Sequence, residues 1–128
     1  MKTLPERVSK AWEDRDGPIV LATVDEQGVP NAIYASCVKK LNDGQWVVAD
    51  NYFHKTRANI EAGSRASLLF ITSKRKSCQL KGTLSYETEG PVYDEMKVWV
   101  KEMNPKLPGV AAVVLTVDEI YCGAEKLL

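Results

Sequence analysis

Six segments of this 128-residue chain are rich in β-branched and other apolar residues, and turn residues bound each of them. Such segments are typical of β-strands. The turn at residues 42–44, Asn-Asp-Gly, favours a hairpin because these residues tolerate positive φ. The predicted strands are residues 18–25, 30–41, 45–50, 65–72, 77–88 and 109–123.

Three helices are predicted around these strands. The first begins near Pro5 and ends before Gly17, a short one follows residue 54 and ends at Gly63, and the third runs from Pro91 to the break at Pro105. The apolar faces are Val8, Ala11 and Trp12 in the first helix, and Met96, Val100 and Met103 in the third.

The order is therefore a helix, three strands, a short helix, two strands, a helix and a last strand. Strands joined by tight turns pair antiparallel, because a parallel partner needs a long crossover. Closure of six apolar strands into a small barrel would remove exposed edges. The prediction is a mainly β, α+β barrel in one domain covering residues 1–128.

Charge and hydropathy exclude several classes of protein. The 17 basic and 17 acidic side chains balance, which argues against a nucleic-acid binder that relies on bulk positive charge and against a polybasic membrane anchor. No apolar run approaches the roughly 18 residues of a membrane-spanning helix, and the charged N-terminus does not resemble a signal peptide. We therefore expect a cytoplasmic protein with neither nucleic acid nor membrane as partner.

The cysteines are three in number and form no C-x-x-C pair. An odd set of this kind, Cys37, Cys78 and Cys122, predicts reduced thiols rather than a disulfide framework or a zinc site. His54 is the only histidine and has no second ligand at metal-binding spacing, so no metal site is predicted.

The candidate chemistry lies in "ADNYFHKTRANIEAG", residues 49–63, where a strand leads through a bend into the short helix. The first N–H groups of a helix have no internal partner and carry the positive end of the macrodipole. Thr56 can cap these groups or donate to an anion, and Lys55 adds a full positive charge, so together they form a candidate phosphate site. The alternative is a solvated lysine beside an ordinary cap, with His54 packing or capping.

A second basic cluster, "TSKRKSC" at residues 72–78, is either a solvated strand connection or a second arm that closes on an anionic ligand. The aromatic side chains divide in a similar way. Trp12, Trp99 and Tyr93 have helical spacing and are expected in the core. Tyr34, Tyr52 and Phe53 are better placed to contact a planar ligand. The sequence contains no G-x-G-x-x-G, P-loop or G-x-S-x-G motif.

With this strand order, the segment "WVVADNYFHKTRANIEAGSRASLLF" resembles the FMN-binding split-barrel family, which includes pyridoxamine 5′-phosphate oxidases, and in particular its small single-domain members. Their pattern is a strand, a bend, a His-Lys-Thr-like triplet and a short helix with Asn. Here the pattern falls on residues 49–51, Phe53, residues 54–56 and Asn59. The resemblance covers residues 17–91 and implies a six-stranded antiparallel split barrel of Greek-key order with short flanking helices.

The same resemblance implies FMN at the interface of a homodimer, with its phosphate on Lys55 and Thr56. The flavin would lie beside residues 31–34 and 49–51, and residues 77–79 would approach from the next strand pair. No catalytic residue is assigned. The implied cofactor contacts are Asn31, Ala32, Ile33, Tyr34, Ala49, Asp50, Asn51, Phe53, His54, Lys55, Thr56, Asn59, Ser77, Cys78 and Gln79.

Two classes of function stay open. One is an FMN-dependent oxidoreductase or electron-transfer protein that works with NAD(P)H or a redox partner protein. The other is a protein that binds or stores flavin, or haem or a deazaflavin, without catalysis. Full-length pyridoxamine phosphate oxidases hold their substrate with a C-terminal segment that carries arginine and histidine. The tail "DEIYCGAEKLL" has neither, so we expect FMN binding without oxidation of pyridoxamine phosphate.

Overall fold

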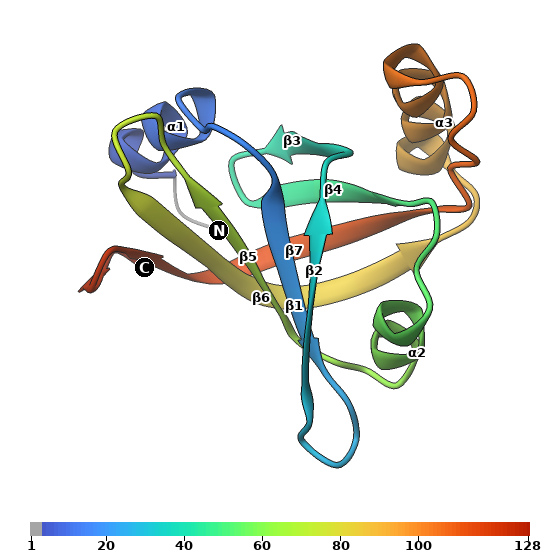
Figure 1. Ribbon diagram of the computed structural model, residues 1–128, viewed down its shortest axis with the longest axis horizontal. Coiled ribbons are helices and arrows are strands. Elements are labelled where there is room, and N and C mark those ends of the chain that lie inside the picture. The colour runs from blue at the N-terminus through green and yellow to red at the C-terminus, as the bar shows by residue number, and fades with distance from the viewer. Residues whose placement is uncertain (1–3) are drawn as a thin grey trace.

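A curled antiparallel sheet organises residues 4–128, the part of the chain that the computed structural model describes (Figure 1). The sheet order is β2-β1-β5-β6-β7-β4-β3, and β8 pairs with β7. β4 therefore lies beside β7, on the far side from β5 and β6, which is a Greek-key order. The strands are β1 (Ile19–Val24), β2 (Pro30–Ala35), β3 (Val38–Asn42), β4 (Gln45–Asp50), β5 (Ala66–Ile71), β6 (Ser77–Glu87), β7 (Ala111–Cys122) and β8 (Glu125–Lys126).

The barrel is split, as the family resemblance implied, but residues 4–128 form eight strands rather than six. Residues 30–41, predicted as one strand, form both β2 and β3. The chain bends at Ser36 and Cys37, so that β2 pairs with β1 while β3 pairs with β4 at the opposite edge of the sheet. No glycine or proline marks this bend. The expectation that closure removes both edges is wrong, because β2 and β3 remain edge strands.

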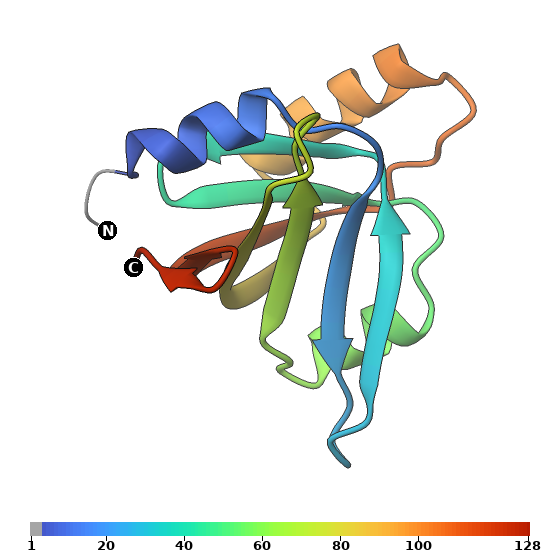
Figure 2. The same ribbon diagram turned by 60° about the vertical axis from the view of Figure 1, so that its left-hand side comes forward.

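Helix α1 (Glu6–Glu13) covers one end of the barrel, and α2 (Lys55–Glu61) lies near the opposite end of β1 and β5 (Figure 2). α1 buries Val8 and Trp12, as its apolar spacing predicted. The Trp12 ring meets Trp46 and Phe70 edge-on, with centroids 5.8 and 5.2 Å apart. These aromatic contacts fix α1 against the main core.

Helix α3 (Pro91–Met103) packs outside the barrel and covers a second, smaller apolar cluster. Met96 and Val100 are fully buried there, as predicted. Met103 was predicted on the same face but is 52% exposed, because it is the last residue of α3 and borders an open hollow beside Ala35 and Val38. None of the helices in residues 4–128 is long and apolar enough to cross a membrane.

The prediction of three reduced thiols is wrong for two of them. Cys78 of β6 and Cys122 of β7 form a disulfide, while Cys37 is free and buried. The two bonded residues are direct partners in the β6–β7 register although 44 positions separate them in sequence. Only the strand pairing brings them together, which is why counting and local spacing could not find the bond.

Candidate functional site

A cluster of buried polar side chains anchors α2 to the β1–β2 hairpin. The Nδ2 of Asn31 donates to the Thr56 hydroxyl at 3.0 Å, and the Nδ2 of Asn59 donates to the Thr23 hydroxyl at 3.0 Å. Thr23, Thr56 and Asn59 are all buried. Buried polar groups need such partners to offset the loss of water. The cluster therefore holds the start of α2 at a defined position on the barrel.

Asp50, at the end of β4, shapes the bend before α2. Its side chain is 2% exposed and accepts hydrogen bonds from the Phe53 N–H at 2.9 Å and from the Tyr86 hydroxyl at 2.6 Å. The Arg57 Nε lies 4.0 Å from the same carboxylate. Burial, together with the hydrogen bond to Asp50, raises the pKa of the Tyr86 hydroxyl above its ordinary value. Asp50 thus faces the protein interior and sets the course of the bend.

Beside this bend lies a half-open pocket of about 310 Å³, between β2, β4 and the loop that follows α3. The Asn51 side chain closes one side, since its Oδ1 accepts the Gly109 N–H at 3.0 Å. Tyr34 and Tyr52, on the pocket rim, are 77% and 76% exposed. The lining contains no charged residue and consists of Ile33, Tyr34, Ala35, Ser36, Cys37, Ala49, Asn51, Tyr52, Phe53 and Leu107.

The start of α2 is open to solvent. His54 is the N-cap residue, and no side chain there makes a capping hydrogen bond. Of the two alternatives for Thr56, capping the helix is excluded, because Thr56 lies inside the first turn and its hydroxyl accepts from Asn31. His54 and Lys55 are both exposed. A cation and free N–H groups are therefore available next to the pocket.

The structure gathers most of the predicted contact residues in this region. Five of them line the pocket, three form or join the polar cluster, and Asp50 lies beneath the bend. Ala32 is exposed on β2. Sequence reasoning missed Thr23, Tyr86 and Leu107, which come from distant segments and carry no motif. Thr23 alone had a usable signal, as a polar residue within an apolar strand.

Residues 77–79 lie at the other end of the barrel from α2. Ser77 pairs with Ile71 at one end of β5, whereas Ala66 at the other end adjoins the segment after α2. The basic turn between β5 and β6 therefore lies beside α1, away from α2 (Figure 1). Within one chain, Ser77, Cys78 and Gln79 do not join the pocket that Phe53 lines.

The fold and this site define a split-barrel protein with a small, uncharged pocket at the edge of the split. The family model for pyridoxamine 5′-phosphate oxidase matches residues 5–122, and the chain therefore belongs to this family. An uncharacterised protein of Methanocaldococcus jannaschii, MJ0282, is 32% identical over 120 residues, which are 92% of this chain and 79% of that protein.

Solved structures confirm the fold. HupZ of Group A Streptococcus superposes with a TM-score of 0.82 at 23% identity, over 97% of each chain. An FMN-binding protein of Syntrophomonas wolfei gives a TM-score of 0.71 at 21% identity, over 86% of this chain and 78% of that one. HutZ of Vibrio cholerae, described as a haem storage protein, gives 0.71 at 19% identity, over 94% of each.

Proposed function

We propose that this chain binds FMN in the pocket beside α2 and acts as a flavin-dependent redox protein. The observation that carries the proposal is the placement of five implied contact residues around one uncharged pocket that adjoins Lys55. These residues are Ile33, Tyr34, Ala49, Asn51 and Phe53.

Each part of FMN has a matching feature. The planar ring suits a slot lined by aromatic and small apolar side chains, with Asn51 as a polar partner at its edge. The terminal phosphate suits the exposed Lys55 ammonium, and the buried Thr56 hydroxyl, bonded to Asn31, holds the start of α2 in place beneath it. When bound, FMN supplies the electron-transfer chemistry, and the residues of this chain bind and orient it.

We also propose that a second copy of the chain completes the flavin site. The pocket is open on one side, and Tyr34 and Tyr52 leave most of their surfaces uncovered at its rim. Residues 77–79 of the same chain lie at the other end of the barrel, so they would reach the flavin only from a partner. A homodimer with the flavin at its interface satisfies both features.

The direct test is to purify the protein and record its visible spectrum. We expect a yellow protein that releases FMN, identified by mass, when it is denatured. Colourless protein that does not bind added FMN at micromolar concentration would contradict the proposal. FAD serves as the control ligand and should bind more weakly, because its phosphates are not terminal.

Haem is the second candidate, supported by the fold shared with HutZ and by the exposed His54 at the bend. Haem added to the purified protein would then produce a Soret band that shifts in His54→Ala. An unchanged band in that variant would exclude His54 as a ligand.

Reduction of bound FMN decides between enzyme and carrier. Rapid bleaching by NADH or NADPH alone would identify an oxidoreductase that uses a nicotinamide cofactor. Flavin that is reduced only through a partner redox protein would identify a carrier.

A further inference from the structure

A second pocket, of about 380 Å³, lies at the α1 end of the barrel. Its walls are α1, the turn between β5 and β6, and the end of β7. Five of the twelve lining residues are cationic, namely Arg7, Lys10, Lys74, Arg75 and Lys76, and Asp14 is the one acid. Arg7 pairs with Glu125, and Lys10 lies 3.3 Å from Glu6. Within residues 4–128, no acidic side chain forms an ion pair with the three cations of the turn.

The turn that carries these cations has a defined shape. Thr72 N–H donates to the Lys76 carbonyl at 2.8 Å, and the Thr72 hydroxyl accepts the Lys76 N–H at 3.1 Å. Arg75 has a φ of 63°, a left-handed conformation that glycine or asparagine adopts more easily. The turn thus presents three adjacent cationic residues to the pocket. Arg75 is one of them, although its left-handed backbone conformation would suit glycine or asparagine better.

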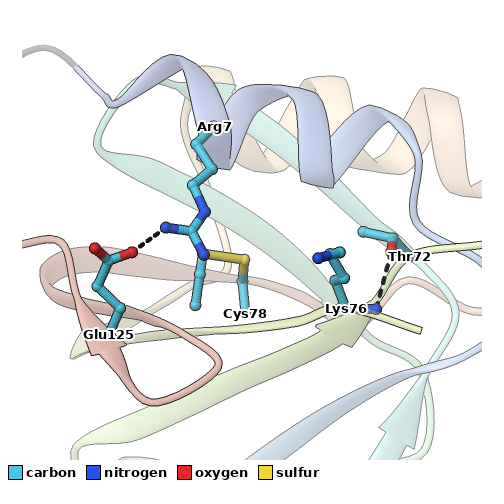
Figure 3. Close-up of a disulfide and its surroundings, with 6 residues drawn as sticks. Arg7, Thr72, Lys76, Cys78 and Glu125 are labelled. Carbon is cyan, nitrogen blue, oxygen red and sulfur yellow. Dashed lines mark hydrogen bonds and ion pairs between the residues drawn. A yellow bond between two sulfur atoms is a disulfide. The ribbon is translucent and has the colours of Figure 1, made fainter. Parts of the chain in front are cut away.

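The Cys78–Cys122 disulfide forms part of the wall of this pocket. Both cysteines are almost buried, at 3% and 4% exposure, so a reagent would approach them through the pocket. Figure 3 shows the disulfide below α1. The Arg7 side chain extends from α1 past the disulfide toward Glu125, and Lys76 lies on the turn near Thr72. A thiol that enters this pocket would therefore pass close to cationic side chains when it approaches the disulfide.

We propose that Cys78 and Cys122 are a reversible redox pair, and that the cationic pocket admits a small anionic thiol as their reductant. Positive charge would concentrate an anionic thiol at the pocket and stabilise its reactive thiolate form. The proposal does not rest on flavin binding, but the two sites share Ser77 and Cys78, so the exchange is tested on protein freed of FMN.

The exchange balances without any further reagent. The thiolate of the small molecule attacks one cysteine Sγ, forms a mixed disulfide and releases the other cysteine as a thiolate. A second small thiolate attacks the small-molecule sulfur of the mixed disulfide, forms the symmetric disulfide and releases the remaining cysteine as a thiolate. Two small thiols are oxidised, and the protein disulfide takes up two electrons and two protons. The same symmetric disulfide reverses the reaction.

Two small thiols of similar size and opposite charge provide the test: 2-mercaptoethanesulfonate, which is anionic, and cysteamine, which is cationic. The folded, oxidised protein is mixed with each thiol, and the reaction is stopped at set times with an alkylating agent. Mass spectrometry then counts the alkylated cysteines. Per thiolate present, we expect reduction by the sulfonate to be about tenfold faster at low salt, with the difference shrinking at high salt. Equal rates would overturn the proposal.

Charge-removing variants locate the effect. Lys74→Gln combined with Arg75→Asn should abolish the preference for the sulfonate, and the asparagine suits the left-handed backbone, so the turn is retained. Lys106→Gln, which removes an exposed lysine outside the pocket, should leave the preference unchanged. A preference that survives the double variant would overturn the proposal. So would reduction that occurs only as fast as the protein unfolds, because the disulfide would then be inaccessible in the folded state.

Discussion

At the scale of single residues, the structure gives Asp50 a structural role in place of the flavin contact that the family resemblance implied. Asp50 was expected beside the flavin, yet its side chain faces inward and holds Phe53 and Tyr86. Its role is to shape the bend that positions the pocket. A strand-end aspartate gives no sign of this, because the decisive partner, Tyr86, lies 36 positions away.

Replacing Tyr86 with Phe should lower the free energy of unfolding by about 1–3 kcal/mol, because it leaves one oxygen of a buried carboxylate without its donor. Urea unfolding followed by tryptophan fluorescence measures the change. Thr83→Val, which removes a hydroxyl from an exposed position on the same strand, is the control and should change stability by no more than about 0.5 kcal/mol. Equal stability of Tyr86→Phe and the wild type would contradict the role of this hydrogen bond.

The same hydroxyl makes stability depend on pH. Because folding raises the pKa of Tyr86, the folded state favours its neutral form. The corresponding stabilisation is complete below the unfolded-state pKa of about 10 and is lost as the pH rises above that value. We therefore expect the urea midpoint of the wild type to fall more steeply above about pH 10 than that of Tyr86→Phe. Parallel curves would contradict this assignment.

Lys55→Ala should weaken FMN binding by about 1.5–3 kcal/mol if the ammonium contacts the phosphate. Quenching of flavin fluorescence during titration measures the affinity. Lys126→Ala removes an exposed lysine from β8, outside the pocket, and serves as the control. Unchanged affinity in Lys55→Ala would remove this residue from the phosphate site.

At the scale of elements, the contact between β6 and β7 leaves no room for a side chain at Gly82. The register shifts between Lys81 and Gly82, and a Cβ on Gly82 would lie 2.7 Å from the carbonyl carbon of Thr116. Backbone atoms of a central strand cannot move aside as a flexible side chain can. The glycine therefore permits the close approach of two strands at a bulge.

Gly82→Ala should destabilise the fold by about 3 kcal/mol or more, at the upper end of overpacking effects. Gly28→Ala is the matched control, because Gly28 has a φ of 84° but open space around it and should cost only about 1 kcal/mol. Urea midpoints of the two variants give the comparison. Similar values would show that β7 yields at this position.

The helices and hairpins were predictable because each depends on nearby residues. Proline at a first turn, apolar spacing and a terminal glycine located all three helices, and Asn-Asp-Gly located the β3–β4 hairpin. The break between β2 and β3 was not predictable, because residues 30–41 stay extended on both sides of it. Only the change of pairing partner, from β1 to β4, separates the two strands.

At the scale of the whole molecule, the exposed pocket and its aromatic rim suggest a dimer. Sedimentation at micromolar concentration should give the mass of two chains. Tyr34→Glu, a charge at a side chain that is 77% exposed beside the pocket, should shift the protein toward monomer and weaken FMN binding. Val98→Glu on α3, at a position 60% exposed, is the control and should remain dimeric. A wild-type monomer that binds FMN fully would contradict the shared site.

If FMN binds in this pocket as proposed, the distribution of charge predicts its redox potential. The ten residues that line the pocket include no lysine or arginine, and Lys74, Arg75 and Lys76 lie at the other end of the barrel. A cation near the ring stabilises the reduced, anionic flavin, so its absence favours a midpoint potential at or below that of free FMN. Reductive titration with a reference dye measures the potential. A value clearly above free FMN would mean that a cation from the partner chain reaches the ring.

The sequence by itself determined the helices, the antiparallel hairpins, the family and the segment that carries the candidate phosphate site. These features follow from local residue chemistry and from motifs of adjacent residues. The tertiary structure decided the split between β2 and β3, the inward role of Asp50, the Cys78–Cys122 bond and the separation of residues 77–79 from the pocket. Each of these depends on which distant strands pair and in what register, because register sets which side chains meet across the sheet.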